Sequence, residues 1–279
     1  MPRKRITQVF PGLLSLRRKQ RIACFYLGMR LDAKQYAAKK SDVLLPHLVF
    51  ASACPMYNPD TGFDMVYQEN KVFNVKLAAS QLEGALIRPG ETFSFWKYVH
   101  AADKHIPYKN ALAELNGELQ PVYGGGLCQL SNVIFWLFLH APLTILERHG
   151  HDKKDFPEPP SDALLGVDAT VYEGWLDLKV RNDTSNTYQL GFSFSQTEIC
   201  ASLYCDVRPG ADIRVSNENL VYRQEKGGIF EEVDVVQTCM ERETGKLLFA
   251  RKLYRNRCRI GYPLPDDVPV LPDGRRSHA

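Results

Sequence analysis

A cysteine set behind three glycines is the part of the sequence best suited to covalent chemistry. Glycines at 124–126 lead to Cys128, and an apolar run follows over residues 130–139. Glycine adopts positive φ at little cost and lets other groups approach the backbone closely, and a segment that is apolar on all sides is typical of a buried helix. We therefore predict Cys128 at a helix N-terminus, where the dipole and free N–H groups favour the nucleophilic thiolate. A packing role is the alternative, although a core cysteine needs no glycine platform.

Two histidines downstream supply a candidate base. A cysteine nucleophile needs a base within hydrogen-bond reach and usually a third group that orients this base. A helix followed by a returning strand would bring His149 and His151 back beside the start of the helix. Asp168 and Asp177 are carboxylates that could fix the imidazole tautomer. This set of residues predicts thiol-dependent acyl transfer or amide cleavage.

Groups for holding a substrate surround the same segments. The Gln129 N–H, with another N–H of the glycine loop, could stabilise an oxyanion. Arg148 could bind a substrate carboxylate through two parallel hydrogen bonds, and a structural ion pair is equally open. The candidate substrate-binding residues are Gly125, Gly126, Gln129, Ser131, Arg148 and His149.

The sequence predicts neither a metal nor another cofactor. Cys128 with His149 and His151 would need a fourth ligand, and the paired Cys-x-x-Cys of structural zinc sites is missing. The seven cysteines have no regular spacing, so they do not resemble a secreted disulfide framework and favour a reduced compartment.

Charge is concentrated at the N-terminus. The first 30 residues hold eight basic residues and no acidic one, so they carry +8 and the remainder about −5, by subtraction from the net +3. This segment reads either as a solvated, partly disordered arm or as an arm lying on an anionic membrane surface. No recognition motif accompanies the charge, so nucleic acid is not an expected partner. Neither a signal peptide nor an apolar run of membrane-spanning length is evident. We expect a cytoplasmic protein, peripheral at the inner membrane face in the second reading.

The pattern of elements predicts an α+β fold: a mixed domain in which a buried helix carries the cysteine at its N-terminus and packs on a β-sheet, followed by a smaller β-rich region. Periodicity predicts helices over 70–87 and 129–140. Strands are predicted over 91–96, 144–147, 168–180, 188–195, 199–207, 230–237 and 247–254, with a hairpin near 243–246. The expected divisions are a basic N-terminal arm (1–34), the α+β domain (35–183), the β-rich C-terminal region (184–262) and a loose tail (263–279). Alternatively, the regions 35–183 and 184–262 share one core.

Several motifs resemble the VanW family in order and spacing. They are Pro-Gly-Glu-Thr-Phe-Ser-Phe at 89–95, Gly-Gly-Gly-Leu-Cys-Gln-Leu-Ser at 124–131, Glu-Arg-His-Gly-His at 147–151, Asp-Ala at 168–169 and Asp-Leu-Lys-Val-Arg-Asn at 177–182. The resemblance implies a role in glycopeptide (vancomycin) resistance and bacterial cell-wall metabolism. Some larger, exported proteins with VanW domains are associated with L,D-transpeptidation of peptidoglycan stem peptides. Matched by motif, Cys128 is the family cysteine, His151 the histidine three residues after the arginine, and Asp168 the aspartate of the Asp-Ala pair.

The combined expectation is a cysteine-dependent acyl transferase or amidase, L,D-transpeptidase-like, acting on peptidoglycan stem peptides or their precursors. Cys128 would be the nucleophile, His151 its base and Asp168 the group that orients the base. The alternative is a non-catalytic accessory module that binds precursors or resistance enzymes, and a metal-stabilised structural domain is a third. Cross-linking occurs outside the membrane, and no export signal is seen. A cytoplasmic precursor substrate, unconventional export and a domain that no longer catalyses therefore all stay open.

Overall fold

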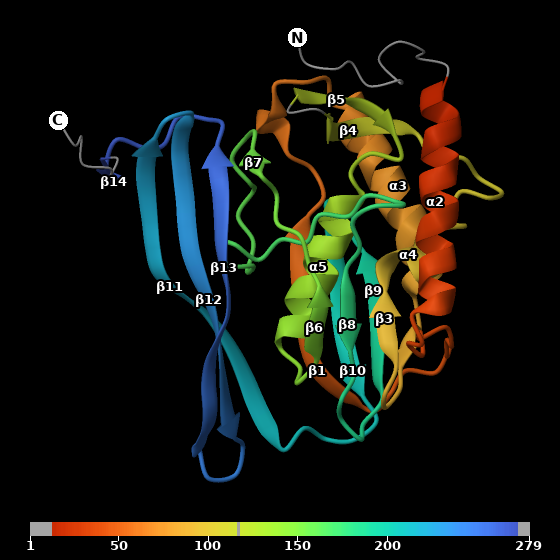
Figure 1. Cartoon of the computed structure of the whole chain (residues 1–279). Coiled ribbons are helices and arrows are strands. Elements are labelled where there is room, and N and C mark those ends of the chain that lie inside the picture. Colours follow the sequence, from red (N-terminus) through yellow and green to blue (C-terminus); the bar gives the residue numbers. More distant parts are fainter. Residues whose placement is uncertain (1–12, 116–117, 273–279) are drawn as a thin grey trace.

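The fold is α+β, as the sequence predicts: a mixed body of helices and sheets stands beside a long twisted ribbon of strands (Figure 1). The structure, a computed structural model, describes residues 13–115 and 118–272. The helices are α2 (Leu13–Leu31), α3 (Val66–Leu82), α4 (Phe95–Val99) and α5 (Leu127–Leu139), with a 3-10 turn, η1, at Pro59–Thr61.

Two sheets and a hairpin belong to the body. The first sheet is antiparallel, in the order β1 (His47–Pro55), β10 (Glu198–Cys205), β9 (Tyr188–Phe194), β2 (Leu86–Ile87). The second has the order β3 (Thr92–Ser94), β8 (Lys179–Arg181), β6 (Thr144–Glu147), and the hairpin is β4 (Asn110–Leu115) with β5 (Glu118–Tyr123). The ribbon has the order β14 (Val270–Leu271), β11 (Ala211–Glu225), β12 (Gly228–Glu241), β13 (Leu247–Ile260), β7 (Lys153–Lys154).

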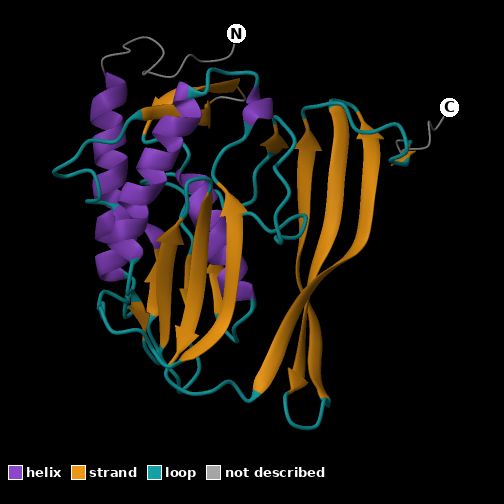
Figure 2. Cartoon of the chain, turned by 180° about the vertical axis from the view of Figure 1, so that it is seen from behind, coloured by secondary structure: helices purple, strands orange, loops and turns teal. Residues whose placement is uncertain are grey.

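Helix α5 is the centre of the body. It packs on β1, β10 and α3, and the first sheet covers one side of it when the molecule is seen from behind (Figure 2). Phe138 meets Phe93 of β3 edge to face, with ring centroids 5.0 Å apart. Gln237 of β12 donates to the Leu139 carbonyl at 2.8 Å, which ties the ribbon to the C-terminal end of the helix. The all-round apolar character of the segment is thus explained by neighbours on every side.

Several predicted elements are corrected by the structure. The helix expected over 70–87 is α3, and it ends at Leu82. Gly84 turns the chain with φ 72°, and Leu86–Ile87 pair with β9 as a strand. The strand expected over 91–96 ends at Ser94, whose hydroxyl accepts from the Lys97 N–H and caps α4. Strands β1, β4, β5 and β11 were not anticipated.

The expected boundary at residue 184 falls inside the body, because β9 and β10 complete the sheet that contains β1 and β2. The ribbon begins only at β11. Within the expected N-terminal arm, residues 13–31 form α2, and within the expected loose tail Val270–Leu271 pair with β11. Residues 1–12 and 273–279 of those two segments lie outside the described residues.

All seven cysteines are free thiols. Among the described residues, no helix combines the length and apolar character needed to cross a bilayer.

Candidate active site

Cys128 lies in the first turn of α5, and the glycines before it are required by their surroundings. Gly126 caps the helix with φ 89°, a conformation that favours glycine. A Cβ atom there would lie 2.3 Å from Lys71 Cγ of α3, and one on Gly125 would lie 2.2 Å from the Ala111 carbonyl oxygen of β4. The loop can therefore press against α3 and β4 only without side chains, and this contact sets the position of Cys128.

The start of α5 leaves backbone donors free beside the thiol. The Gln129 N–H donates to the Gly126 carbonyl at 3.1 Å, so it is occupied and does not serve as the expected oxyanion donor. By contrast, the N–H groups of Leu127 and Cys128 have no acceptor among the described residues. The first N–H groups of a helix lack intrahelical partners, and here they are available next to the sulfur. The thiol itself lies 3.7 Å from the Val171 carbonyl oxygen.

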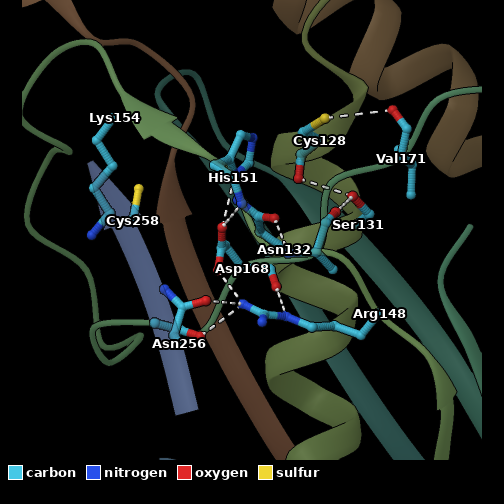
Figure 3. A network of polar contacts seen from close by, with 12 residues as sticks. Cys128, Ser131, Asn132, Arg148, His151, Lys154, Asp168, Val171, Asn256 and Cys258 are labelled. Carbon is cyan, nitrogen blue, oxygen red and sulfur yellow. Dashed lines mark hydrogen bonds and ion pairs between the residues drawn. The ribbon is translucent and has the colours of Figure 1, made fainter. Parts of the chain in front are cut away.

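His151 lies between Cys128 and a buried carboxylate. Its Nδ1 is 2.8 Å from Asp168 Oδ2, and its backbone N–H donates to the same oxygen at 2.6 Å. Burial disfavours the charged imidazole, but hydrogen bonds with Asp168 and with the Cys128 sulfur outweigh it and hold the pKa of His151 well above its ordinary value. Figure 3 shows the imidazole above Asp168, with Cys128 beside it.

Asp168 is anchored from its other side by Arg148. The guanidinium bonds Asp168 Oδ1, and it donates to the Asp168 carbonyl at 2.5 Å and the Gly166 carbonyl at 3.0 Å (Figure 3). It also donates to Asn256 Oδ1 of β13 at 2.9 Å. Burial opposes ionisation of Asp168, yet the contacts with His151 and Arg148 prevail and lower its pKa to about 2. Asp168 is therefore an anion that fixes the ring of His151.

Helix α5 holds the backbone next to Asp168. Ser131 Oγ donates to the Ala169 carbonyl at 2.5 Å, and Asn132 Oδ1 accepts from the Ala169 N–H at 2.7 Å. The Thr170 N–H donates to the His149 carbonyl at 2.7 Å. These side-chain and loop contacts use the backbone groups that a ladder would need. The strand expected over 168–180 therefore does not start at 168, and only its end is formed, as part of β8 (Lys179–Arg181).

The candidate residues divide into two groups. Cys128, His151 and Asp168 meet in one place, with Gly125 and Gly126 beneath the helix start. The others are engaged elsewhere: Ser131 is fully buried on Ala169, Arg148 is committed to Asp168, His149 Nε2 is 3.1 Å from Glu147 Oε1, and the Gln129 amide donates to the Pro55 carbonyl at 2.6 Å. Asp177, the second carboxylate considered, accepts from Ser94 Oγ at 2.5 Å and the Trp96 N–H at 3.2 Å.

Sequence reasoning missed three contributors. The sequence could have indicated Asn132, because it is an amide four residues after Cys128 in a largely apolar helix. It could not have indicated Asn256, because that residue lies in a distant strand. Lys71 of α3 is half-buried with its side chain against Gly126. Burial, opposed only in part by Cys54, lowers the pKa of Lys71 to about 8.

Comparison with known proteins identifies the family. The model of the VanW family (VanW like protein) matches residues 70–204, which hold Cys128, His151 and Asp168. Over 270 residues the chain is 51% identical to the vancomycin B-type resistance protein VanW of Enterococcus faecalis, covering 97% of this chain and 98% of that protein. The chain belongs to the VanW family. A shorter match, with 33% identity over 114 residues, covers 41% of the chain and 36% of the uncharacterized protein YoaR of Bacillus subtilis. No solved structure is significantly similar to this VanW-family chain.

Proposed function

We propose that this VanW-family chain takes part in vancomycin resistance as a cysteine-dependent acyl transferase, L,D-transpeptidase-like, acting on peptidoglycan stem peptides or their precursors. The observation that carries the proposal is the line from Cys128 through His151 to Asp168, in which His151 Nδ1 is 2.8 Å from the carboxylate and the neighbouring Cys128 helps to raise the pKa of the ring. A nucleophile, a base and a group that orients the base are the parts that thiol acyl transfer requires.

The first half-reaction forms a thioester. The thiol proton moves to the ring nitrogen of His151 that does not face Asp168, and the sulfur attacks a peptide carbonyl carbon. The N–H groups of Leu127 and Cys128 are the available donors for the resulting oxyanion. As the carbon–nitrogen bond breaks, His151 returns its proton to the departing amine. The raised pKa of His151 keeps that proton at hand for this transfer.

The second half-reaction releases the acyl group. An incoming amine attacks the thioester and gives a new peptide bond, or water attacks and gives a carboxylic acid. His151 accepts the proton of the attacking group and passes it to the sulfur as the carbon–sulfur bond breaks. Asp168 holds the imidazole in one tautomer and one orientation throughout, which its two contacts with His151 permit.

The substrate class rests on family membership, since the E. faecalis relative is named as a vancomycin resistance protein. The contacts of the candidate residues narrow how a stem peptide would be held. Arg148 already donates to Asp168, so a different cation would have to bind a carboxylate of the peptide. Lys71, whose side chain lies against Gly126, is one candidate.

The test follows Cys128 in the intact chain. Alkylation rates across pH would be read by mass spectrometry, with Cys24 as the internal reference because it is an exposed thiol on α2. We expect Cys128 to react faster than Cys24 at about pH 6, and His151→Ala to remove that advantage. Incubation with a synthetic stem peptide should then add the acyl mass to Cys128. Equal rates for the two thiols, unchanged in the variant, together with no acyl adduct, would refute the transferase.

The competing proposal is a non-catalytic module that binds precursor peptides or resistance enzymes. Its support is the number of site residues committed to structural contacts, Arg148 and Ser131 foremost. It predicts saturable binding of a stem peptide that Cys128→Ser leaves unchanged, with no covalent adduct in the wild-type chain.

A further inference from the structure

The outward face of helix α2 carries an apolar stripe with basic side chains on both borders. Leu16, Ala23, Leu27 and Leu31 are spaced seven, four and four residues apart, so they follow one side of the helix, where Gln20 is the one polar residue among them. The three leucines expose 63%, 53% and 74% of their surface. Isolated exposed leucines are ordinary, but an aligned row along one helix marks a contact surface.

The opposite face of α2 explains why the stripe must point outward. Ile22 lies against Gly174, where an added Cβ would come within 2.9 Å of its Cγ1, and Tyr26 donates to Glu173 at 2.9 Å. Met29 is buried. The inner face is therefore already packed on the body, and the helix runs along one edge of the molecule (Figure 1).

The borders of the stripe are basic. Arg17 lies on one side of it, and Lys19 and Arg30 lie on the other. The helix contains no acidic residue, and no ion pair in the described part of the chain involves Arg17, Lys19 or Arg30. Exposed leucines flanked by cations, on a helix without an acid, suit the interface of an anionic lipid surface.

We propose that α2 is a docking surface for an anionic lipid bilayer, with Leu16, Leu27 and Leu31 entering the acyl boundary and the bordering cations contacting lipid headgroups. A second copy of the chain fits less well, because pairing two such faces would oppose rows of like charge with no acid between them. Nucleic acid fits less well too, because phosphates would meet the leucines at the centre of the face.

The surface adjoins the candidate site. Arg21 lies over the Tyr172 ring, 5.2 Å from its centroid, and Tyr172 directly follows Val171, whose carbonyl contacts the Cys128 sulfur. Docking through α2 would hold the Cys128 site close to the lipid surface. The proposal does not depend on the chemistry at Cys128, so a chain with Cys128→Ala should bind lipid equally well.

The test measures binding of the full chain to vesicles of phosphatidylglycerol and phosphatidylcholine in equal parts, against phosphatidylcholine alone. Trp175 is the reporter, because it is 63% exposed beside α2 whereas Trp96 and Trp136 are buried. Co-sedimentation gives the affinity. We expect binding to the anionic vesicles only, weakened by salt, since the headgroup attraction is screened within a Debye length.

Matched variants test whether binding depends on this face of α2 or only on the total charge and apolar surface of the chain. Arg17→Gln with Arg30→Gln should weaken binding about 25-fold, at about fivefold for each cation. Lys226→Gln with Lys246→Gln removes the same charge from ribbon turns and should leave binding unchanged. Leu27→Gln should weaken binding about tenfold, while Leu247→Gln, a ribbon leucine equally exposed at 53%, should not.

Three results would overturn the proposal. The first is no binding to anionic vesicles. The second is equal losses in the α2 and ribbon variants, which would mean that the face is not specific. The third is a dimer in sedimentation analysis that Leu27→Gln dissociates, since a second copy would then cover the stripe.

Discussion

Replacement of Arg148 by methionine tests whether this arginine supports the site or binds substrate. Both Arg148 and Asp168 are nearly buried, with 11% and 6% of their side chains exposed. Arg148→Met keeps the length of the side chain but leaves the Asp168 carboxylate with His151 as its only charged partner. Removing one member of a buried ion pair costs about 3–5 kcal/mol. This is a large part of the ~5–15 kcal/mol by which domains are stable.

Urea unfolding followed by circular dichroism would give the change in free energy of unfolding. Arg148→Lys keeps the charge without the planar fork, so its loss should be smaller. The matched control is Arg181→Met, because Arg181 pairs with Asp183 on the open surface and should contribute little. The folded fraction of Arg148→Met should also lose the fast alkylation of Cys128. If Arg148→Met and Arg181→Met were equally stable, the anchoring role would be refuted and Arg148 would be free to bind substrate.

Three further predictions concern the surroundings of Cys128. Asp168→Asn should destabilise the fold by roughly 2–3 kcal/mol near neutral pH, because the pKa of Asp168 is about 2 in the folded chain against ~3.9 unfolded. Because the folded value is the lower one, urea titrations should show this difference shrinking as pH falls from about 4 to about 2. Lys71→Met should stabilise the fold by about 1–3 kcal/mol at pH 7, since a half-buried lysine with a pKa of about 8 opposes folding while it is charged. Wild-type stability should then rise between about pH 8 and pH 10 and close the gap, and a constant gap across that range would contradict the assignment. Gly125→Ala should slow Cys128 alkylation and lower the thermal midpoint, because its Cβ meets the Ala111 carbonyl, whereas Gly210→Ala, in open space, should change neither.

The sequence predicts the centre of the molecule better than its edges. Helix α5 was anticipated within two residues at its start and one at its end, because a strongly apolar segment bounded by glycines and Ala141-Pro142 leaves little choice. The hairpin between β12 and β13 was also found, since Thr244-Gly245 is strong turn chemistry. Strand β11 was missed because none of its residues is fully buried, so the pattern of apolar side chains on which strand prediction depends is faint there.

The site was predicted as a set of residue types but not as a set of contacts. The spacing of Cys128, His151 and Asp168 indicates a nucleophile, a base and an orienting group, and the structure brings these three together. The same reasoning could not decide whether Arg148 binds substrate or forms a structural ion pair. Only the folded chain shows that Gly166, Asp168 and Asn256 take up its donors. Periodicity reports burial and spacing along one element, whereas such contacts join elements distant in sequence.

The ribbon is part of the candidate site, although the family model ends at residue 204 before the ribbon begins. Asn256 accepts from Arg148, and the Tyr254 ring lies 4.4 Å from the Arg148 guanidinium while its hydroxyl donates to the Gly166 carbonyl at 3.1 Å. Gly166 itself has no room for a side chain, because a Cβ would lie 2.7 Å from Val233 Cγ1 of β12. The carboxylate that orients His151 is thus anchored to an arginine that two ribbon residues hold in place. It follows that residues 70–204 contain the candidate reacting groups but only part of the structure that holds them in place.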